Sequence, residues 1–155
     1  MKENEMHVFI RGASHYFDQL PIKAEIGMPY LKDQEVVMLD FSAAIGISGP
    51  RRGCVYYTAP REMARQLAAD SGEPDTSEAL CADMVGEIAN IISGNACEEL
   101  GAAFMISVPM VLVGRPDEVR FPEGVPTFLI PIFWRDLKSL LVICLEDATG
   151  NGSAS

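Results

Sequence analysis

The chain has 155 residues, 48% of them hydrophobic, which is enough for one domain with a sizeable core but not for two ordinary domains. Its formal net charge of −10 argues against a nucleic-acid partner, which requires a basic face. No apolar run approaches the roughly 20 residues of a membrane span, and the N-terminus lacks the pattern of a signal peptide. We therefore expect a cytoplasmic protein with one domain over residues 1–147 and a disordered tail at 148–155.

The first half of the chain begins with a helical pattern and continues with extended ones. Hydrophobic spacing predicts a helix over residues 5–20 that ends before Pro21. Pro60 favours the start of a short helix over residues 61–69. Between these helices we expect three strands, at residues 22–31, 35–47 and 53–58.

The second half opens with the longest helical pattern in the chain. We expect this helix to begin near Asp75, because Asp75-x-x-Glu78 resembles a capping box, and to end at Gly101. Three β-rich runs follow it, at residues 103–114, 127–135 and 139–145. This order of elements predicts an α+β fold, with helices packed on one or both faces of a mixed or antiparallel sheet.

A faint internal repeat suggests that the domain consists of two similar halves. Residues 25–31 parallel residues 105–111, eighty positions later, and a predicted helix precedes each segment. The same shift aligns Glu87 with His7 and Asn90 with Ile10. If the halves are duplicates, only the second carries this carboxylate and carboxamide, so we expect one candidate site per chain.

The long helix carries a line of polar residues that is the best candidate for a functional site. Asp83, Glu87, Asn90 and Gly94 are spaced at i, i+4, i+7 and i+11, which places them almost on one line. Such a face is commonly just the solvated side of an amphipathic helix. However, Asn and Gly each cost some tenths to about 1 kcal/mol relative to Ala inside a helix. The presence of Asn and Gly beside a glutamate indicates a flat surface that the backbone of another molecule can approach.

The remaining reactive side chains do not form a second candidate site. His7 and His15 have no third ligand at metal-site spacing, so we expect no zinc site. The cysteines lack a Cys-x-x-Cys pair, which makes a metal or disulfide role improbable. They are Cys54, Cys81, Cys97 and Cys144.

The polar line also matches a known motif. Asp83-x3-Glu87-x2-Asn90, followed by Ile-Ile-Ser-Gly94 and later by Pro109, resembles the CheC/CheX family of chemotaxis phosphatases. The chain has one intact motif, and its first half lacks the corresponding carboxylate and carboxamide. This arrangement is similar to CheX rather than CheC. Looser matches extend the resemblance over most of the chain, at residues 28–31, 46–53 and 121–126.

The resemblance implies a phosphatase for the phospho-aspartate of a CheY-type receiver domain, acting as a homodimer joined edge to edge through a continuous sheet. It implies that Asn90 positions the attacking water and that Glu87 pairs with a lysine of the receiver. Asp83 and Gly94 would contact the partner. No family role is carried over to Pro109, which we expect to be structural because a proline ends or bends a strand. The Mg²⁺ ion would belong to the receiver, so the chain would need no cofactor of its own.

The residue types suit this chemistry, although two other interpretations stay open. A carboxamide at Asn90 can hydrogen-bond a water without adding negative charge beside a phosphoryl group. Glu87 can engage a lysine through a charge-assisted hydrogen bond. The alternatives are a non-catalytic module that binds a receiver or a flagellar-switch component, and a purely structural dimer. Only the phosphatase needs both Glu87 and Asn90.

Overall fold

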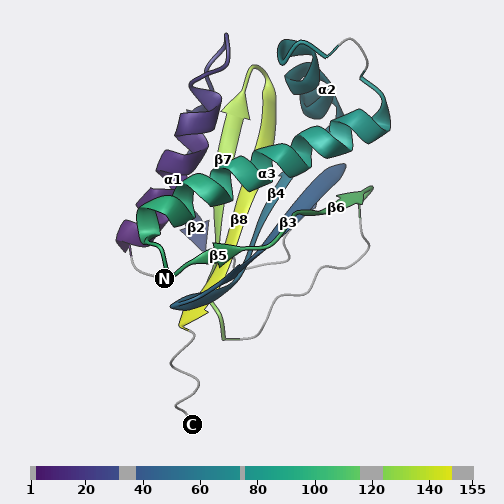
Figure 1. Ribbon diagram of the computed structural model, residues 1–155. Coiled ribbons are helices and arrows are strands. Elements are labelled where there is room, and N and C mark those ends of the chain that lie inside the picture. The colour runs from purple at the N-terminus through teal and green to yellow at the C-terminus, as the bar shows by residue number, and fades with distance from the viewer. Residues whose placement is uncertain (1–2, 32–37, 74–75, 116–123, 148–155) are drawn as a thin grey trace.

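Two copies of one helix-and-strand unit follow each other in the computed structural model, which describes residues 3–31, 38–73, 76–115 and 124–147 (Figure 1). The first unit consists of α1 (Glu3–Phe17), β1 (Glu25–Ile26), β2 (Tyr30–Leu31), β3 (Phe41–Ser48) and β4 (Arg51–Ala59). The second consists of α3 (Glu78–Leu100), β5 (Met105–Ile106), β6 (Met110–Val113), β7 (Thr127–Trp134) and β8 (Leu137–Asp147). Between the units lies α2 (Arg61–Asp70). The expected tail at 148–155 falls outside the described residues.

The described strands form one antiparallel sheet in the order β1-β7-β8-β4-β3-β5, in which β2 also pairs with β7 and β6 with β3. The hairpins β3–β4 and β7–β8 meet at the centre, where β4 pairs with β8. The short strands of each unit pair with the hairpin of the other unit. This exchange confirms the predicted α+β fold with two similar halves.

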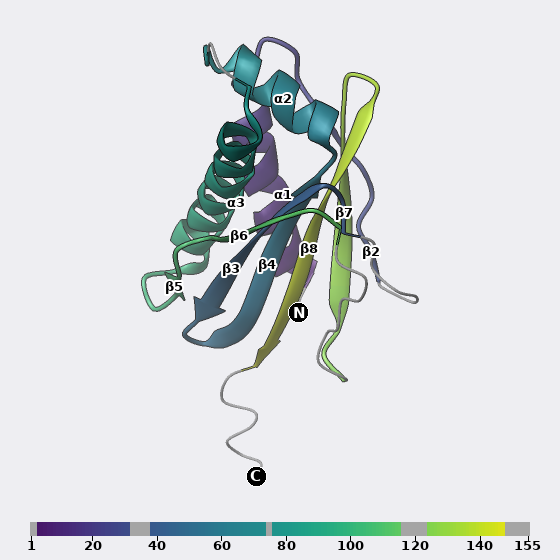
Figure 2. The same cartoon turned by 90° about the vertical axis from the view of Figure 1, so that its right-hand side faces the viewer.

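The helices α1 and α3 pack on one face of the sheet, and α3 crosses it diagonally (Figure 1 and Figure 2). A smaller apolar cluster on the sheet comprises Met38, Leu129, Leu140 and Val142. The main core contains side chains from both helices and from the long strands, among them the fully buried Phe9, Phe17, Tyr57, Ile88 and Trp134. Burial of this side of α3 leaves its opposite side at the surface.

The long helix begins later than the sequence pattern indicates. Its N-cap is Ser77, whose side-chain oxygen accepts a hydrogen bond from the Leu80 N–H at 3.3 Å. The predicted capping box with Asp75 as N-cap is therefore wrong, because Ser77 directly precedes the first helical residue, Glu78. The helix ends at Gly101 as predicted, and this residue has a φ of 133° that favours glycine.

Four other predicted elements are shorter than expected. The first helix ends at Phe17, and a tight turn follows before Pro21. The runs at 22–31 and 103–114 are each divided into two short strands, because Pro29 and Pro109 have no N–H to donate to a ladder. The strand expected from residue 35 begins at Phe41, while residues 35–37 lie outside the described residues.

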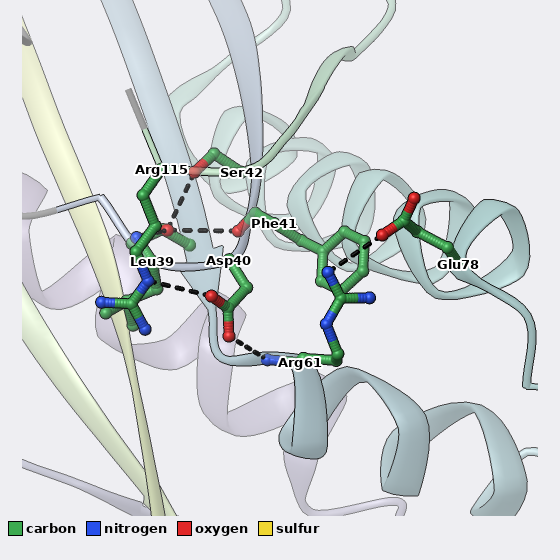
Figure 3. Close-up of polar contacts among 8 residues, drawn as sticks. Leu39, Asp40, Phe41, Ser42, Arg61, Glu78 and Arg115 are labelled. Atoms are coloured by element: carbon green, nitrogen blue, oxygen red, sulfur yellow. Dashed lines mark hydrogen bonds and ion pairs between the residues drawn. The ribbon is translucent and has the colours of Figure 1, made fainter. Parts of the chain in front are cut away.

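A polar network around Asp40 connects the starts of α2 and α3 with the residue after Gly114 (Figure 3). Asp40 accepts hydrogen bonds from Arg115 Nε at 2.9 Å and from the Arg61 backbone N–H at 2.7 Å. Arg61 Nη2 in turn lies 2.9 Å from Glu78 Oε2 at the start of α3. Arg115, and then the Arg61 N–H, lower the pKa of Asp40 below its usual range. These contacts hold the end of α3 at which the polar line begins.

Candidate functional site

The predicted polar line lies along the exposed face of α3. Asp83, Glu87 and Asn90 are exposed, and Gly94 is half-buried. Ile91 was expected in the core but is only half-buried. The other aliphatic residues of the helix are buried as expected: Met84, Val85, Ile88, Ile92 and Ala96. The structure therefore brings the four predicted site residues together on one surface.

The polar side chains of the line have no partners within the described part of the chain. Asp83, Glu87 and Asn90 take part in no hydrogen bond or ion pair there. By contrast, Glu99 on the same helix accepts three hydrogen bonds from Arg11, with a shortest distance of 2.9 Å. The line is thus available to an external partner, whereas Glu99, another exposed carboxylate of α3, already serves the fold.

Tyr16 of α1 borders the line on one side. Its hydroxyl donates to Met84 Sδ at 3.9 Å, and Met84 lies one turn before Glu87 on α3. Burial, and then the negative charge of Glu87, raise the pKa of Tyr16 to about 12. The phenol therefore stays neutral near Glu87 at physiological pH. No sequence signal indicated Tyr16, because its position depends on how α1 crosses α3.

The segment from β5 to β6 borders the line on the other side. A Cβ added at Gly86 would lie 2.9 Å from Val111 Cγ2 and 3.8 Å from Pro109 Cβ. Gly86 therefore lets this segment pack directly against α3. Pro109 has the structural position expected for it, between two strands and beside the helix. Val108 projects from the segment with 84% of its surface exposed, which gives the line an apolar margin.

A hollow of about 380 Å³ opens beside Gly94, at the far end of the line. Its apolar lining includes Cys97, Phe104 and Ile106. A Cβ added at Gly94 would meet only Ile106 Cδ1, at an ordinary contact distance of 3.9 Å. The fold therefore does not require a glycine at Gly94, in contrast to Gly86.

Other candidate groups add no second site among the described residues. No three His, Cys, Asp or Glu side chains are arranged there to hold a metal ion, and all four cysteines are free. The described helices include none that is long and apolar enough to cross a membrane. His7 and Ile10, the counterparts of Glu87 and Asn90, offer neither a carboxylate nor a carboxamide.

The geometry of the line restricts how it can act. Small-molecule sites are concave and surround most of their ligand. Asp83, Glu87 and Asn90 instead stand exposed on the surface of one helix. They are suited to a group that a second macromolecule carries. The fold and this surface thus favour a protein that docks its long helix onto a partner.

Comparison with known families agrees with this class of protein. The family model described as chemotaxis phosphatase CheX matches residues 41–133, more than half of the chain. The protein therefore belongs to the CheX family. A comparison with curated proteins gave no match.

Solved structures share the fold over nearly the whole chain. The chemotaxis protein CheX from Desulfovibrio desulfuricans is 26% identical, with a TM-score of 0.81 over 92% of this chain and 99% of that one. A CheX–CheY–BeF3–Mg²⁺ complex from Borrelia burgdorferi gives 24% identity and a TM-score of 0.74, over 92% and 97%. FliY from Thermotoga maritima gives 15% identity and a TM-score of 0.62, over 93% and 91%. The last two likenesses show the fold alone.

Proposed function

We propose that this protein removes the phosphoryl group from the phospho-aspartate of a CheY-type receiver domain. The observation that carries the proposal is the exposed line of α3, in which Glu87 and Asn90 have no partner among the described residues. Membership of the CheX family supports it, as does the Borrelia burgdorferi structure, in which a CheX protein is bound to CheY. With that partner, the site of action is the cytoplasm.

Asn90 is the residue proposed to position the attacking water. An acyl phosphate is already reactive, so its hydrolysis requires mainly a water held in line with the bond that breaks. The water oxygen forms the new bond to phosphorus, and the bond from phosphorus to the aspartyl oxygen breaks. The Asn90 carboxamide can accept a hydrogen bond from this water. A carboxylate at the same position would repel the phosphoryl oxygens.

Glu87 is proposed to fix the orientation of the docked helix. It lies about one turn from Asn90 on the same exposed line, roughly 4.5 Å along the helix axis. A carboxylate there can form a charge-assisted hydrogen bond with a lysine of the receiver. Such a bond would hold Asn90 at one distance from the phosphoryl group. Asp83, one turn earlier, extends the same contact surface.

The receiver is proposed to supply the remaining parts of the site. Mg²⁺ bound by the receiver would neutralise the phosphoryl oxygens when the two proteins meet. The residues Asp83, Glu87 and Asn90 would then complete a site that neither protein has alone. The chain itself is proposed to need no cofactor.

A non-catalytic binding module is the second candidate function. One fold can host unrelated functions, so the fold by itself does not establish catalysis. A docking surface, however, does not need a carboxamide next to a carboxylate. The same substitution therefore separates the two candidates, because only the phosphatase depends on Asn90 for turnover.

The deciding experiment measures phosphate release from a CheY-type receiver charged with acetyl phosphate. Asn90→Ala should lower the rate by about 100-fold or more, because a misplaced reacting group costs that much. Asn95→Ala is the control for loss of a carboxamide from the same helix, at a half-buried position beside α1 and away from the polar line. Both variants should bind the beryllofluoride-charged receiver like the parent protein.

Each result has a distinct meaning. Turnover by the parent and by Asn95→Ala, but not by Asn90→Ala, supports the proposed role of Asn90. Equal turnover by all three proteins contradicts that role. Binding without turnover in all three favours the non-catalytic module.

A further inference from the structure

We propose that the hollow beside Gly94 receives an apolar side chain of the receiver, next to a lysine or arginine that meets Glu98. This inference rests on the proposed function and deepens it. It concerns which receivers the protein selects rather than how the phosphoryl group is hydrolysed.

The hollow is large enough to admit a side chain, and its walls are mostly apolar. Its volume is about 380 Å³, and Phe104, Ile106 and Cys97 form its apolar walls.

The position of the hollow makes it part of any interface that covers the polar line. Gly94 lies one turn beyond Asn90, about 6 Å along the helix axis. A specific interface buries about 800 Å² on each partner, which extends much further than one turn. A receiver seated on Glu87 and Asn90 must therefore also cover the hollow. An apolar side chain fills it, whereas an unfilled hollow would leave its lining without contacts.

Gly94 itself indicates that the hollow is kept open. A glycine inside a helix destabilises it, and here no neighbour of the chain requires one, since Ile106 Cδ1 is 3.9 Å from the added Cβ. Gly12 and Gly86 differ, because an added Cβ would come within 2.9 Å of a neighbour at each. The fold thus explains two of these helix glycines but not Gly94. A surface that must admit a partner's side chain explains the third.

The charge at the rim selects the kind of side chain that lies next to the apolar one. Glu98 is exposed and takes part in no ion pair within the described part of the chain. Its neighbour Glu99 is held by Arg11 at 2.9 Å. Glu98 is therefore the carboxylate available at the rim of the hollow, and a cation is its complementary partner.

The test fills the hollow and reverses the rim charge. Gly94→Leu should extend from α3 toward Ile106 and occupy the hollow. Glu98→Lys removes the complementary charge. Asp136→Lys is the matched control, because it makes the same change of charge at the exposed turn between β7 and β8. The readouts are Kd for a beryllofluoride-charged receiver, and KM and kcat for phosphate release, with the helical circular dichroism of each variant compared with the parent.

The expected result is weaker binding by the two site variants only. Gly94→Leu should raise Kd and KM by about tenfold or more. Glu98→Lys should raise them about threefold to tenfold at low salt and less at high salt. Asp136→Lys should match the parent in both. Glu98→Lys keeps the test decisive if Gly94→Leu does not fold.

Three outcomes overturn the inference in distinguishable ways. If the parent hydrolyses the phospho-receiver and both site variants bind like it, the hollow lies outside the interface and the proposed function stands. If the parent neither binds nor hydrolyses any receiver, the proposed function and this inference fail together. A change of oligomeric state in Gly94→Leu, seen by sedimentation with receiver binding unchanged, would assign the hollow to a second copy of the chain instead.

Discussion

Replacing Gly94 with alanine should stabilise the protein, whereas the same replacement at Gly12 should destabilise it. Both glycines lie inside helices, so alanine lowers the helix cost by about 1 kcal/mol at either position. At Gly94 no contact with the described residues offsets this gain, because the added Cβ meets only Ile106 Cδ1 among them, at 3.9 Å. At Gly12 the added Cβ would lie 2.9 Å from the Ile92 carbonyl oxygen. That oxygen belongs to the backbone of α3, so the two helices would have to separate.

The size of the difference follows from these contacts. Overpacking in a close contact costs about 1–3 kcal/mol, which exceeds the helix gain when the obstacle is backbone. We therefore expect Gly94→Ala to raise the free energy of unfolding by about 1 kcal/mol, and Gly12→Ala to lower it by up to about 2 kcal/mol, the overpacking cost less the helix gain. For a chain of this length, 1 kcal/mol shifts Tm by about 2–4 °C.

Urea-induced unfolding measures the free energy of unfolding of both variants. All samples have the same protein concentration, because the stability of an assembly depends on concentration. A shift in the midpoint with an unchanged slope identifies a change of stability. Equal stabilisation by both alanines would refute the packing assigned to Gly12. Destabilisation by Gly94→Ala would mean that the fold does require this glycine, which would remove the argument for an open hollow.

Three further predictions concern stability against pH and assembly. Burial raises the pKa of Tyr57, so the folded state loses stability as pH rises above about 10, where this tyrosine ionises in the unfolded chain. Tyr57→Phe should reduce this loss of stability in unfolding experiments between pH 8 and pH 11, which roughly span that ionisation. An unchanged dependence of stability on pH would contradict the prediction. Asp40 has a lowered pKa, so its contribution is present above about pH 4 and lost as pH falls below. Asp40→Asn should therefore destabilise the protein at neutral pH and weaken its acid dependence, which urea midpoints at about pH 7 and pH 3 will test. The predicted homodimer would join exposed edge strands such as β6, in which Leu112 is exposed. Leu112→Glu should therefore shift the sedimentation coefficient toward that of the monomer. A parent protein that sediments as a monomer would count against the dimer.

Local patterns in the sequence are sufficient to predict most of the elements and the polar line. The spacing of Asp83, Glu87, Asn90 and Gly94 fixes their common face once the segment is helical. The helix itself follows from its apolar period and from Gly101. The repeat between the two halves indicated a duplicated fold, because similar sequences adopt similar local structure. These features depend on neighbours in the chain.

Features that depend on distant parts of the chain were not predictable in the same way. The pairing of β1 and β2 with β7, rather than with their own hairpin, depends on how the two halves meet. The position of Tyr16 near Glu87 likewise depends on the crossing of α1 and α3. Gly12, Gly86 and Gly94 look alike in the sequence. Only the distances to their neighbours distinguish two packing glycines from one that the fold leaves unexplained.

Glu87 and Asn90 have no partner among the described residues, which is what the proposed function requires of the unbound protein. An exposed polar side chain keeps its water until docking replaces it, so contacts within the described chain would compete with the receiver. A site of this kind is incomplete until the phosphoryl group and its Mg²⁺ arrive with the partner. Stability and catalysis should therefore respond separately to substitution: Asn90→Ala should leave unfolding within about 0.5 kcal/mol of the parent while turnover falls. A variant that lost both together would instead place Asn90 among the residues that maintain the fold.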